Sequence, residues 1–393
     1  MKIARFLTTP LLLGVLATAV AAQTFPITNF EAYPAPSASG AVMFRHPSFS
    51  GSTGLYIDTS PAPNNTSQVV TDVAFSGTKS LRVNWRFLST DPPTGRSRWL
   101  RLTTFNATDL PNPTLDFGHA LRFRIYVPSD TPDFYVTLGV RETNSTAPIG
   151  GNGGTTGGIE FLGATVVRGT GPDAPEGKLI TAKNQWVEVV FNIPVEPVRR
   201  FAGTTANGIL EVSRGVLEQL AFTPLDPNTL GPYVVYLDDF EQVAVWSVSG
   251  NVVLKDFVGD VTQVPVTVEL RQGGNVVRTA SLSLDANGNY TIPAVLPGTY
   301  DIAFKASRWL RVVVSGVTVE GSNVTGVNVA LTNGDIDGDN EVTLLDFGAL
   351  VAAFGAMPGD ANWNASADLD GDLEVTLLDF GILVQNFGAV GDD

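Results

Sequence analysis

Apolar and polar residues alternate with a period of two through most of the first 331 residues. The clearest runs are 80–87, 120–127, 134–141 and 185–193. Successive side chains of a strand point to opposite faces, so each run predicts a strand with one buried and one wet face. Turns rich in Pro, Gly, Asn and Ser separate the runs. Residues 24–243 are therefore predicted to form an antiparallel β-sandwich of the jelly-roll type.

A second series of short strands covers residues 246–331. The turn pairs Asn287-Gly288 and Pro297-Gly298 separate some of them. This spacing predicts a small immunoglobulin-like or prealbumin-like β-sandwich. The order G-x-V, V-x-V-x-L, D-x-N-G-x-Y-x-I and L-P-G-T-Y resembles the carboxypeptidase regulatory-like and collagen-adhesin B-repeat families. That resemblance implies a rigid spacer.

The pattern changes at residue 332, where helical periodicity and an internal repeat replace the alternation. Residues 335–346 return as residues 368–379, an offset of 33. The stretches 341–356 and 374–389 agree at 13 of 16 positions. A short apolar helix is predicted in each copy, at 347–354 and 380–387. Residues 332–393 therefore form an all-α block at the end of a mainly β chain.

Each copy begins with a twelve-residue loop that carries acidic residues at positions 1, 3, 5 and 12. The first three carboxylates converge as the chain wraps, position 7 supplies a backbone carbonyl, and position 9 adds a hydroxyl or a bridging water. The carboxylate at position 12 closes the cage from the first turn of the next helix. Hard oxygen ligands in this number suit Ca²⁺ better than Mg²⁺. A solvated acidic loop is the alternative, and two matching copies disfavour it.

This block resembles a type I dockerin, with two EF-hand-like loop–helix repeats. The resemblance implies two bound Ca²⁺ ions and docking to a cohesin module on a scaffoldin or a cell surface. For the first ion it implies the ligands Asp335, Asp337, Asp339, the Glu341 carbonyl, Thr343 and Asp346. For the second it implies Asp368, Asp370, Asp372, the Glu374 carbonyl, Thr376 and Asp379.

Two departures from the dockerin pattern modify these expectations. Loop position 6 is ordinarily Gly, and here it is Asn340 or Leu373. A leucine in the left-handed conformation costs about 1–2 kcal/mol, so the second loop is expected to bind Ca²⁺ more weakly. Positions 10 and 11, which in dockerins help to choose the cohesin, are leucines in both copies. They either select a partner other than a standard cellulosomal cohesin or pack in the dockerin's own core.

Composition and charge restrict the chemistry further. The 393 residues include no cysteine and two histidines, which excludes disulfides and Cys–zinc sites. Residues 332–393 hold 13 of the 39 acidic residues and no basic residue, and the net charge of −15 argues against a nucleic-acid partner. Residues 1–22 combine Lys2 and Arg5 with a short apolar run and a small-residue cleavage site. They predict a removable signal peptide and a soluble, secreted protein without membrane insertion after cleavage.

The first sandwich carries a looser family signal. The elements 29–31, 76–83 and 236–241 resemble those of galactose-binding-like jelly rolls, a group that contains many carbohydrate-binding modules. The resemblance implies a structural Ca²⁺ held by Glu31 and Asp239. The alternative is that these two carboxylates cap strand ends.

Guanidinium and aromatic groups on the predicted wet faces suit sugar hydroxyls, uronate carboxylates and pyranose rings. Ordinary solvated sheet surface is the alternative. Trp85 and Trp186 are expected in the core, and Trp99 is expected to be exposed. The candidate carbohydrate-binding residues are Arg82, Arg86, Trp99, Arg122, Arg124, Tyr126, Tyr135 and Arg141.

Together these features predict a secreted modular protein that acts in polysaccharide binding or catabolism and is anchored by its dockerin. A glycoside hydrolase on the jelly roll is one alternative, because Glu142, Glu160, Asp173 and Glu188 offer carboxylates. A polysaccharide lyase would place a base such as Tyr126 beside Arg124. A non-catalytic surface or adhesion protein is the third possibility.

Overall fold

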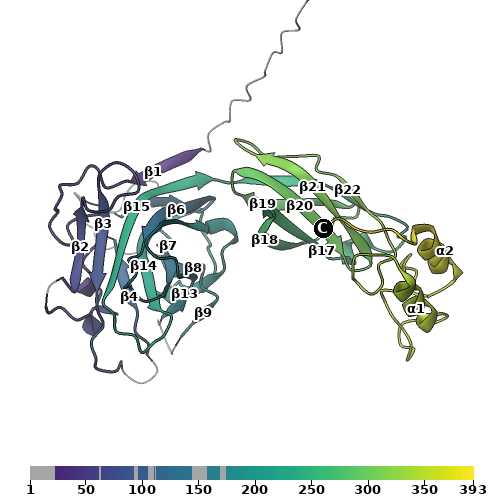
Figure 1. The fold of residues 1–393 in the computed structure, drawn as a ribbon, viewed down its shortest axis with the longest axis horizontal. Coiled ribbons are helices and arrows are strands. Elements are labelled where there is room, and N and C mark those ends of the chain that lie inside the picture. Colours follow the sequence, from purple (N-terminus) through teal and green to yellow (C-terminus); the bar gives the residue numbers. More distant parts are fainter. Residues whose placement is uncertain are drawn as a thin grey trace, which may run out of the picture.

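The computed structural model describes residues 23–61, 63–92, 96–104, 110, 112–143, 157–168 and 174–393. The predicted signal peptide and Asp173 lie outside these residues. Within them the chain is mainly β, with two α-helices near its C-terminus, which confirms the predicted fold class. Two β-sandwiches and a helical unit follow one another along an elongated molecule (Figure 1).

The first sandwich consists of two antiparallel sheets that face each other. The β15 sheet has the order β12-β6-β15-β3-β2, with β1 added to β15. Its strands are β1 Thr24–Thr28, β2 Asn65–Val70, β3 Ser80–Trp85, β6 His119–Tyr126, β12 Trp186–Asn192 and β15 Tyr233–Ala244.

The opposite β14 sheet has the order β13-β8-β7-β14-β4, with β11 added to β7 and β5 to β14. Its strands are β4 Leu100–Thr103, β5 Thr114–Asp116, β7 Phe134–Arg141, β8 Ile159–Leu162, β11 Lys178–Ile180, β13 Val198–Ala202 and β14 Arg214–Pro224. A separate two-stranded pair joins β9 Val166–Val167 to β10 Pro175–Glu176. Short 3-10 turns lie at Pro47–Phe49, Gly54–Tyr56, Ile193–Val195 and Val261–Gln263.

The period-two pattern sets which residues fill the core between these sheets. Leu81, Val83 and Trp85 alternate inward along β3, and all three are buried. The Trp85 ring stacks on Tyr233 of the neighbouring strand with centroids 4.9 Å apart. Trp85 is therefore a core residue, as predicted.

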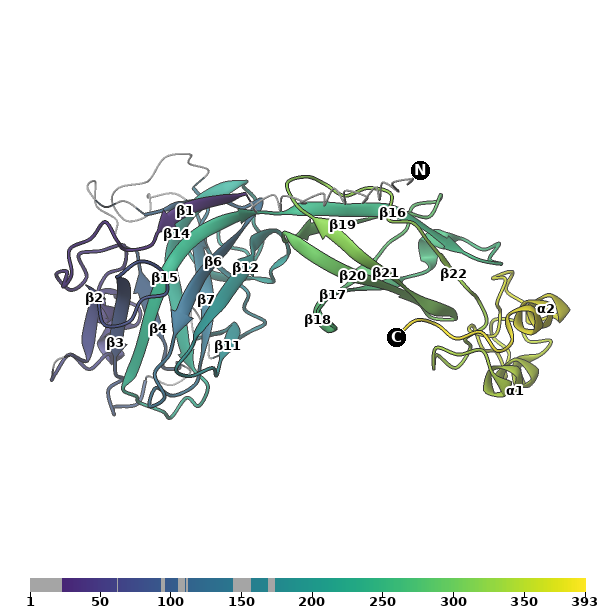
Figure 2. The same cartoon turned by 45° about the horizontal axis from the view of Figure 1, so that its top comes forward.

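The second sandwich packs a three-stranded sheet, β19-β16-β22, on a four-stranded sheet, β18-β17-β20-β21. Its strands are β16 Trp246–Leu254, β17 Val266–Gln272, β18 Asn275–Leu282, β19 Asn289–Val295, β20 Gly298–Ala306, β21 Trp309–Val319 and β22 Val329–Leu331. Val245 alone separates β15 of the first sandwich from β16 of the second, so the chain passes between them without a linker (Figure 2).

The helical unit contains α1 Leu344–Ala353 and α2 Leu377–Asn386. Each helix begins earlier than the apolar pattern predicted, because Thr343 and Thr376 act as N-caps in capping boxes with Asp346 and Asp379. A small core joins the two repeats, and Leu310 of β21 belongs to it. Among the described residues, no helix has the length and apolar character needed to cross a membrane.

Candidate calcium loops and apolar helix face

The first acidic loop wraps around its own carboxylates. Asp346 Oδ1 accepts backbone N–H groups from Ile336 (2.7 Å) and Asp337 (3.1 Å), and its Oδ2 accepts Thr343 N (2.7 Å). Asp335 Oδ1 accepts Gly338 N at 2.8 Å. These bonds bring position 12 of the loop back to its start.

The second loop repeats this geometry. Asp379 accepts Leu369 N (2.6 Å) and Thr376 N (2.7 Å), and Asp368 Oδ1 accepts Gly371 N (2.9 Å). At position 5, Asp339 and Asp372 each accept the backbone N–H of the glutamate two residues on, at 2.9 Å. The sequence repeat is therefore also a structural repeat.

The donor set of both loops fits Ca²⁺. One carboxylate oxygen each from Asp335, Asp337 and Asp346 lies within 4.8 Å of the others, and the same is true of Asp368, Asp370 and Asp372. Asp339 and Asp379 do not join their clusters at this spacing. Burial, followed by the neighbouring carboxylates, raises the pKa of Asp337 and Asp370. A divalent cation between these oxygens would relieve the repulsion.

Position 6 adopts the left-handed conformation that the loop requires. Asn340 has φ 72° and Leu373 has φ 75°. The Asn340 amide is used, because Oδ1 accepts Arg311 N at 2.7 Å and Nδ2 donates to Asp392 O at 3.0 Å. Leu373 is exposed and has no such compensation. The weaker binding expected of the second loop stays a prediction.

The second sandwich reaches into both loops, which the sequence did not reveal. Lys305 Nζ contacts Asp335 Oδ2, and the buried Arg308 guanidinium donates to Asp368 O and to Ala365 O (2.5 Å). Val258 N donates to Asp370 O at 2.8 Å. The two acidic loops thus face the sandwich and the helices face away from it (Figure 1).

The side chains at loop positions 10 and 11 lie on the surface. Leu344 and Leu377 are each 72% exposed, and Leu345 and Leu378 are 66% and 64% exposed. They do not pack in the dockerin's core, so that alternative is wrong. They join a set of exposed apolar side chains, called here the apolar face: Leu344, Leu345, Phe347, Val351, Phe354, Leu377, Leu378, Phe380, Val384 and Phe387.

The predicted carbohydrate-binding residues divide between the two outer surfaces of the jelly roll. Arg82, Arg122, Arg124 and Tyr126 lie on the β15 sheet, and Tyr135 and Arg141 lie on the β14 sheet. Arg86 follows β3 and is exposed. No single surface brings all eight together.

The arginines of the β15 sheet are largely neutralised. Arg122 Nε lies 2.7 Å from Glu241, and Arg124 lies 2.7 Å from Glu188 and over the Phe75 ring. Trp186 is half-buried on this outer surface, between Phe75 and Tyr126, with ring centroids 5.8 and 5.7 Å away. The expectation that Trp186 lies in the core is therefore wrong.

Trp99 is buried, at 2% exposure, against the expectation that it would be exposed. Its ring packs edge-on against Phe161 (5.8 Å) and Phe201 (5.7 Å), over the small Ala221. Strands distant in sequence make this cluster, so the charged neighbours of Trp99 in the chain misled the prediction.

Glu31 and Asp239 both accept hydrogen bonds from the segment 76–79. Glu31 Oε1 accepts Thr78 N and Lys79 N at 2.7 Å each, and Asp239 Oδ1 accepts Ser76 Oγ at 2.7 Å. The Lys79 ammonium donates to Glu31 O at 2.7 Å and so sits beside the predicted ligand. A structural Ca²⁺ at this pair stays a prediction.

The carboxylates considered for hydrolysis have structural contacts. Glu142 accepts Glu211 N at 2.6 Å and Glu160 accepts Asn207 N at 2.7 Å, while Glu188 pairs with Arg124. Burial raises the pKa of Glu160.

Residues 333–388 match the family model of the dockerin type I domain. This part of the chain belongs to that family, which confirms the resemblance. A type I dockerin implies Ca²⁺ binding and a cohesin-type partner. No curated protein sequence matches the chain.

Solved structures similar to the chain include a cohesin–dockerin complex and carbohydrate-binding modules. A mutant type II cohesin–X-dockerin complex from Acetivibrio cellulolyticus is 26% identical over 37% of this chain and 97% of the other, with a TM-score of 0.32. A family 11 carbohydrate-binding module from Clostridium thermocellum is 10% identical over 57% and 97%, with a TM-score of 0.32. A family 30 carbohydrate-binding module of a cellulosomal cellulase from Clostridium thermocellum is 15% identical over 51% and 91%, with a TM-score of 0.25.

Proposed function

We propose that this protein is exported and docks, through the apolar face of its Ca²⁺-loaded dockerin, onto a cohesin-type module of a scaffoldin or cell surface. Its jelly roll then acts on polysaccharide by binding it. The second sandwich holds the two functional parts apart.

The observation that carries this proposal is the apolar face itself. Both repeats expose the same five apolar positions, four in each helix and one at its C-cap, and the only charged side chains in the helices, Asp346 and Asp379, are buried as caps. Phe347 and Phe380 meet edge-on at 6.2 Å, which joins the two helices into one surface. Exposed apolar side chains gathered in this way mark an interaction site.

Calcium supports docking through the helix caps. The carboxylates that would close the two ion cages, Asp346 and Asp379, also cap α1 and α2. In the first loop Asp335, Asp337 and Asp339 would complete the cage, and in the second Asp368, Asp370 and Asp372. Bound Ca²⁺ supplies the positive charge that lets these carboxylates stay close. The orientation of both helices, and so of the apolar face, depends on the loops.

The test is capture by a panel of purified type I and type II cohesin modules. The mature chain is compared with a Leu345→Ser/Leu378→Ser double variant and with Val253→Ser, which changes an exposed valine on β16 outside the apolar face. We expect Ca²⁺-dependent capture of the mature chain and of V253S. The affinity of the double variant for the cohesin should fall by about tenfold or more, since burying each leucine side chain contributes about 1.5–3 kcal/mol. Equal capture of all three proteins would refute docking through this face.

Carbohydrate binding by the jelly roll has its own supporting observation. On the outer surface of the β14 sheet, Arg101 and Arg141 flank Glu218. Nearby polar atoms on the same surface are buried without a hydrogen-bond partner: Thr103 Oγ1, Thr137 Oγ1, Gln219 Nε2 and Thr223 Oγ1. Buried polar groups normally have partners, so such a row favours a ligand rich in hydroxyls. Trp99 covers this surface.

A pull-down of the mature chain on insoluble polysaccharides, with soluble products examined by chromatography, separates the remaining candidates. Retention of the chain on the polysaccharide without soluble product supports binding. Trp99→Ala removes the ring that covers the β14 surface and should alter the retained fraction. Release of sugars supports the glycoside hydrolase or polysaccharide lyase. Neither retention nor release supports the non-catalytic surface protein.

A further inference from the structure

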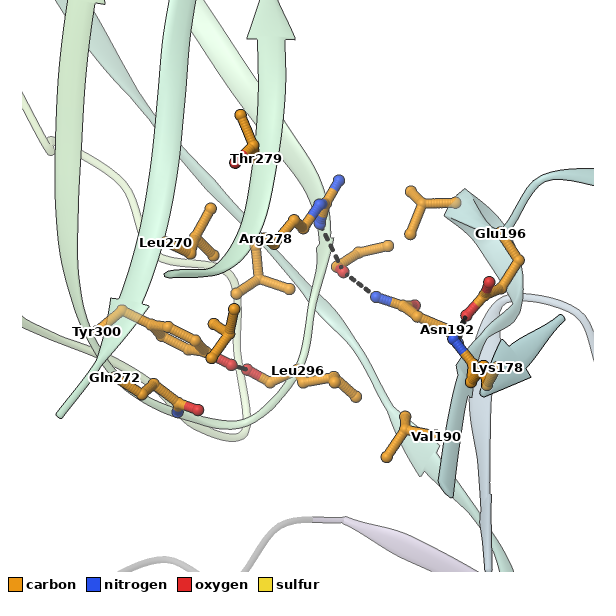
Figure 3. Close-up of a pocket in the computed structure, with 14 residues that line it drawn as sticks. Lys178, Val190, Asn192, Glu196, Leu270, Gln272, Arg278, Thr279, Leu296 and Tyr300 are labelled. Carbon is orange, nitrogen blue, oxygen red and sulfur yellow. Dashed lines mark hydrogen bonds and ion pairs between the residues drawn. The ribbon is translucent and has the colours of Figure 1, made fainter. Parts of the chain in front are cut away.

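A cavity of about 380 Å³ lies between the two sandwiches, a size typical of small-molecule sites, which often form at domain interfaces. The jelly roll contributes one wall and the second sandwich the other (Figure 3). The polar groups that line it include Lys178, Asn192 and Glu196 from the first and Gln272, Arg278 and Tyr300 from the second.

The Arg278 guanidinium is the uncompensated charge in this cavity. It donates to the backbone oxygens of Pro293 (2.7 Å) and Ala294 (3.0 Å). Among the described residues no carboxylate forms an ion pair with Arg278, and burial lowers the pKa of its guanidinium. Lys178, the other cation of the cavity, is already paired with Glu196 at 2.8 Å. The cavity therefore carries a net positive charge in a protein whose net charge is −15.

Asn192 supplies an acceptor that lacks a donor. Its Nδ2 donates to Ala294 O at 2.6 Å, which fixes the orientation of the amide because the carbonyl only accepts. Its Oδ1 is buried and has no hydrogen-bond partner. A ligand hydroxyl would satisfy this oxygen.

Ala294 connects the two groups. Its carbonyl accepts from Asn192 of the jelly roll and from Arg278 of the second sandwich (Figure 3). Its φ of 52° is a conformation that alanine rarely adopts. Backbone held in such a conformation is concentrated at ligand-binding sites, where the surrounding structure maintains it.

We propose that this cavity binds the uronic-acid unit of an acidic polysaccharide. The uronate carboxylate pairs with Arg278, and a ring hydroxyl donates to Asn192 Oδ1. Val190, Val277 and Leu296 line the cavity and receive the C–H surface of the sugar. This site is distinct from the row of unpartnered polar groups on the β14 sheet, although Lys178 of β11 lines it, and it gives the second sandwich a role in recognition.

Isothermal titration of the mature, Ca²⁺-loaded chain with digalacturonate tests the proposal, with the neutral disaccharide galactobiose and with sodium acetate as comparison ligands. We expect digalacturonate to bind and galactobiose not to. Arg278→Met should weaken binding by about tenfold or more, the order of one charge-assisted hydrogen bond. Arg278→Lys keeps the charge, so its affinity for digalacturonate should lie between those of the unchanged chain and of R278M.

Arg271→Met is the matched control, because Arg271 lies on the neighbouring strand and is neutralised by Glu269 at 2.7 Å. It should bind digalacturonate as the unchanged chain does. Absence of digalacturonate binding, or equal binding by R278M, overturns the proposal. Acetate binding as tight as that of digalacturonate also overturns it, since the site would then recognise an anion and not a sugar acid. Thermal melts of each variant verify folding, and R278K tests the site even if R278M fails to fold.

Discussion

The Lys305 ammonium lies 2.8 Å from Asp335 Oδ2, so a strand of the second sandwich is bonded to the first ligand position of the dockerin. Lys305 also donates to the backbone oxygens of Ala306, Ser307 and Trp309. Asp335 is fully buried. The ion pair is therefore part of a packed contact and not a surface salt bridge.

Lys305→Met should destabilise the Ca²⁺-loaded dockerin by about 1.5–3 kcal/mol, because it removes a charge-assisted hydrogen bond between the second sandwich and the buried Asp335 carboxylate. Differential scanning calorimetry of the Ca²⁺-loaded chain would show this as a lower dockerin transition with an unchanged jelly-roll transition. Val276→Ser, at an exposed position of β18 in the same sheet, serves as a control. An unchanged dockerin transition would show that the sandwich contact does not contribute to stability.

Removal of Ca²⁺ should unfold the dockerin first. A ligand present at a hundred times its Kd stabilises the folded state by about 2.7 kcal/mol, which chelation removes. Far-UV circular dichroism during titration with EDTA should report loss of α1 and α2 while the β signal of both sandwiches remains. Retention of the helical signal at full chelation would contradict this expectation.

Leu373→Gly should tighten Ca²⁺ binding at the second loop by about fivefold to tenfold, since it relieves about 1 kcal/mol of left-handed strain in an exposed leucine. The opposite result is expected for Asn340→Gly, because the Asn340 side chain bonds Arg311 N and Asp392 O. Calorimetric titration of both variants with Ca²⁺ measures the two effects. No gain for L373G would show that backbone strain does not limit the second site.

Glu218→Gln should destabilise the jelly roll by about 3 kcal/mol. The buried Glu218 carboxylate accepts from Arg101 (2.9 Å) and Arg141 (3.1 Å), and the amide would leave both guanidinium groups without a counter-charge. Glu188→Gln, at a half-exposed pair with Arg124, should cost less than about 1 kcal/mol. Urea denaturation measures the free energy of unfolding of both variants. Equal losses in E218Q and E188Q would show that the buried Glu218 pairs contribute no more than the half-exposed pair.

Asp238 should make the jelly roll less stable as pH rises from about 4 to about 6. Burial raises its pKa from 3.8 to about 6, so in this window the folded state holds a proton that the unfolded chain releases. The two-unit difference corresponds to about 3 kcal/mol. Denaturation of Asp238→Asn at several pH values should show a flatter dependence than the unchanged chain, with Asp130→Asn as an exposed control. If the stability of D238N fell with pH as steeply as that of the unchanged chain, Asp238 would not be the group responsible.

Local pattern predicted most of the framework. Alternation along β3 placed Leu81, Val83 and Trp85 in the core, because one strand face must be buried whatever the partner strand is. The geometry of the repeated loops was equally predictable, because their acidic residues lie within twelve consecutive residues and the chain itself brings them together.

Contacts between distant segments were not predictable in this way. Trp99 is buried by Phe161 and Phe201, which no feature of its own neighbourhood indicates. Leu344 and Leu377 look like core residues by composition, and their exposure follows from the helix face on which they lie. The contacts of Lys305 and Arg308 with the dockerin depend on the tip of the β20–β21 hairpin meeting the loops. A single basic residue in a predicted strand does not indicate which distant segment it will contact.

The passage of β15 into β16 across Val245 has a mechanical consequence. A hinge needs several residues whose backbone angles can change, and this junction has one. Together with the bonds between the second sandwich and the dockerin, this short junction restrains the distance between the jelly roll and the two helices. The separation between a polysaccharide bound to the jelly roll and a partner bound to the helices would then vary little.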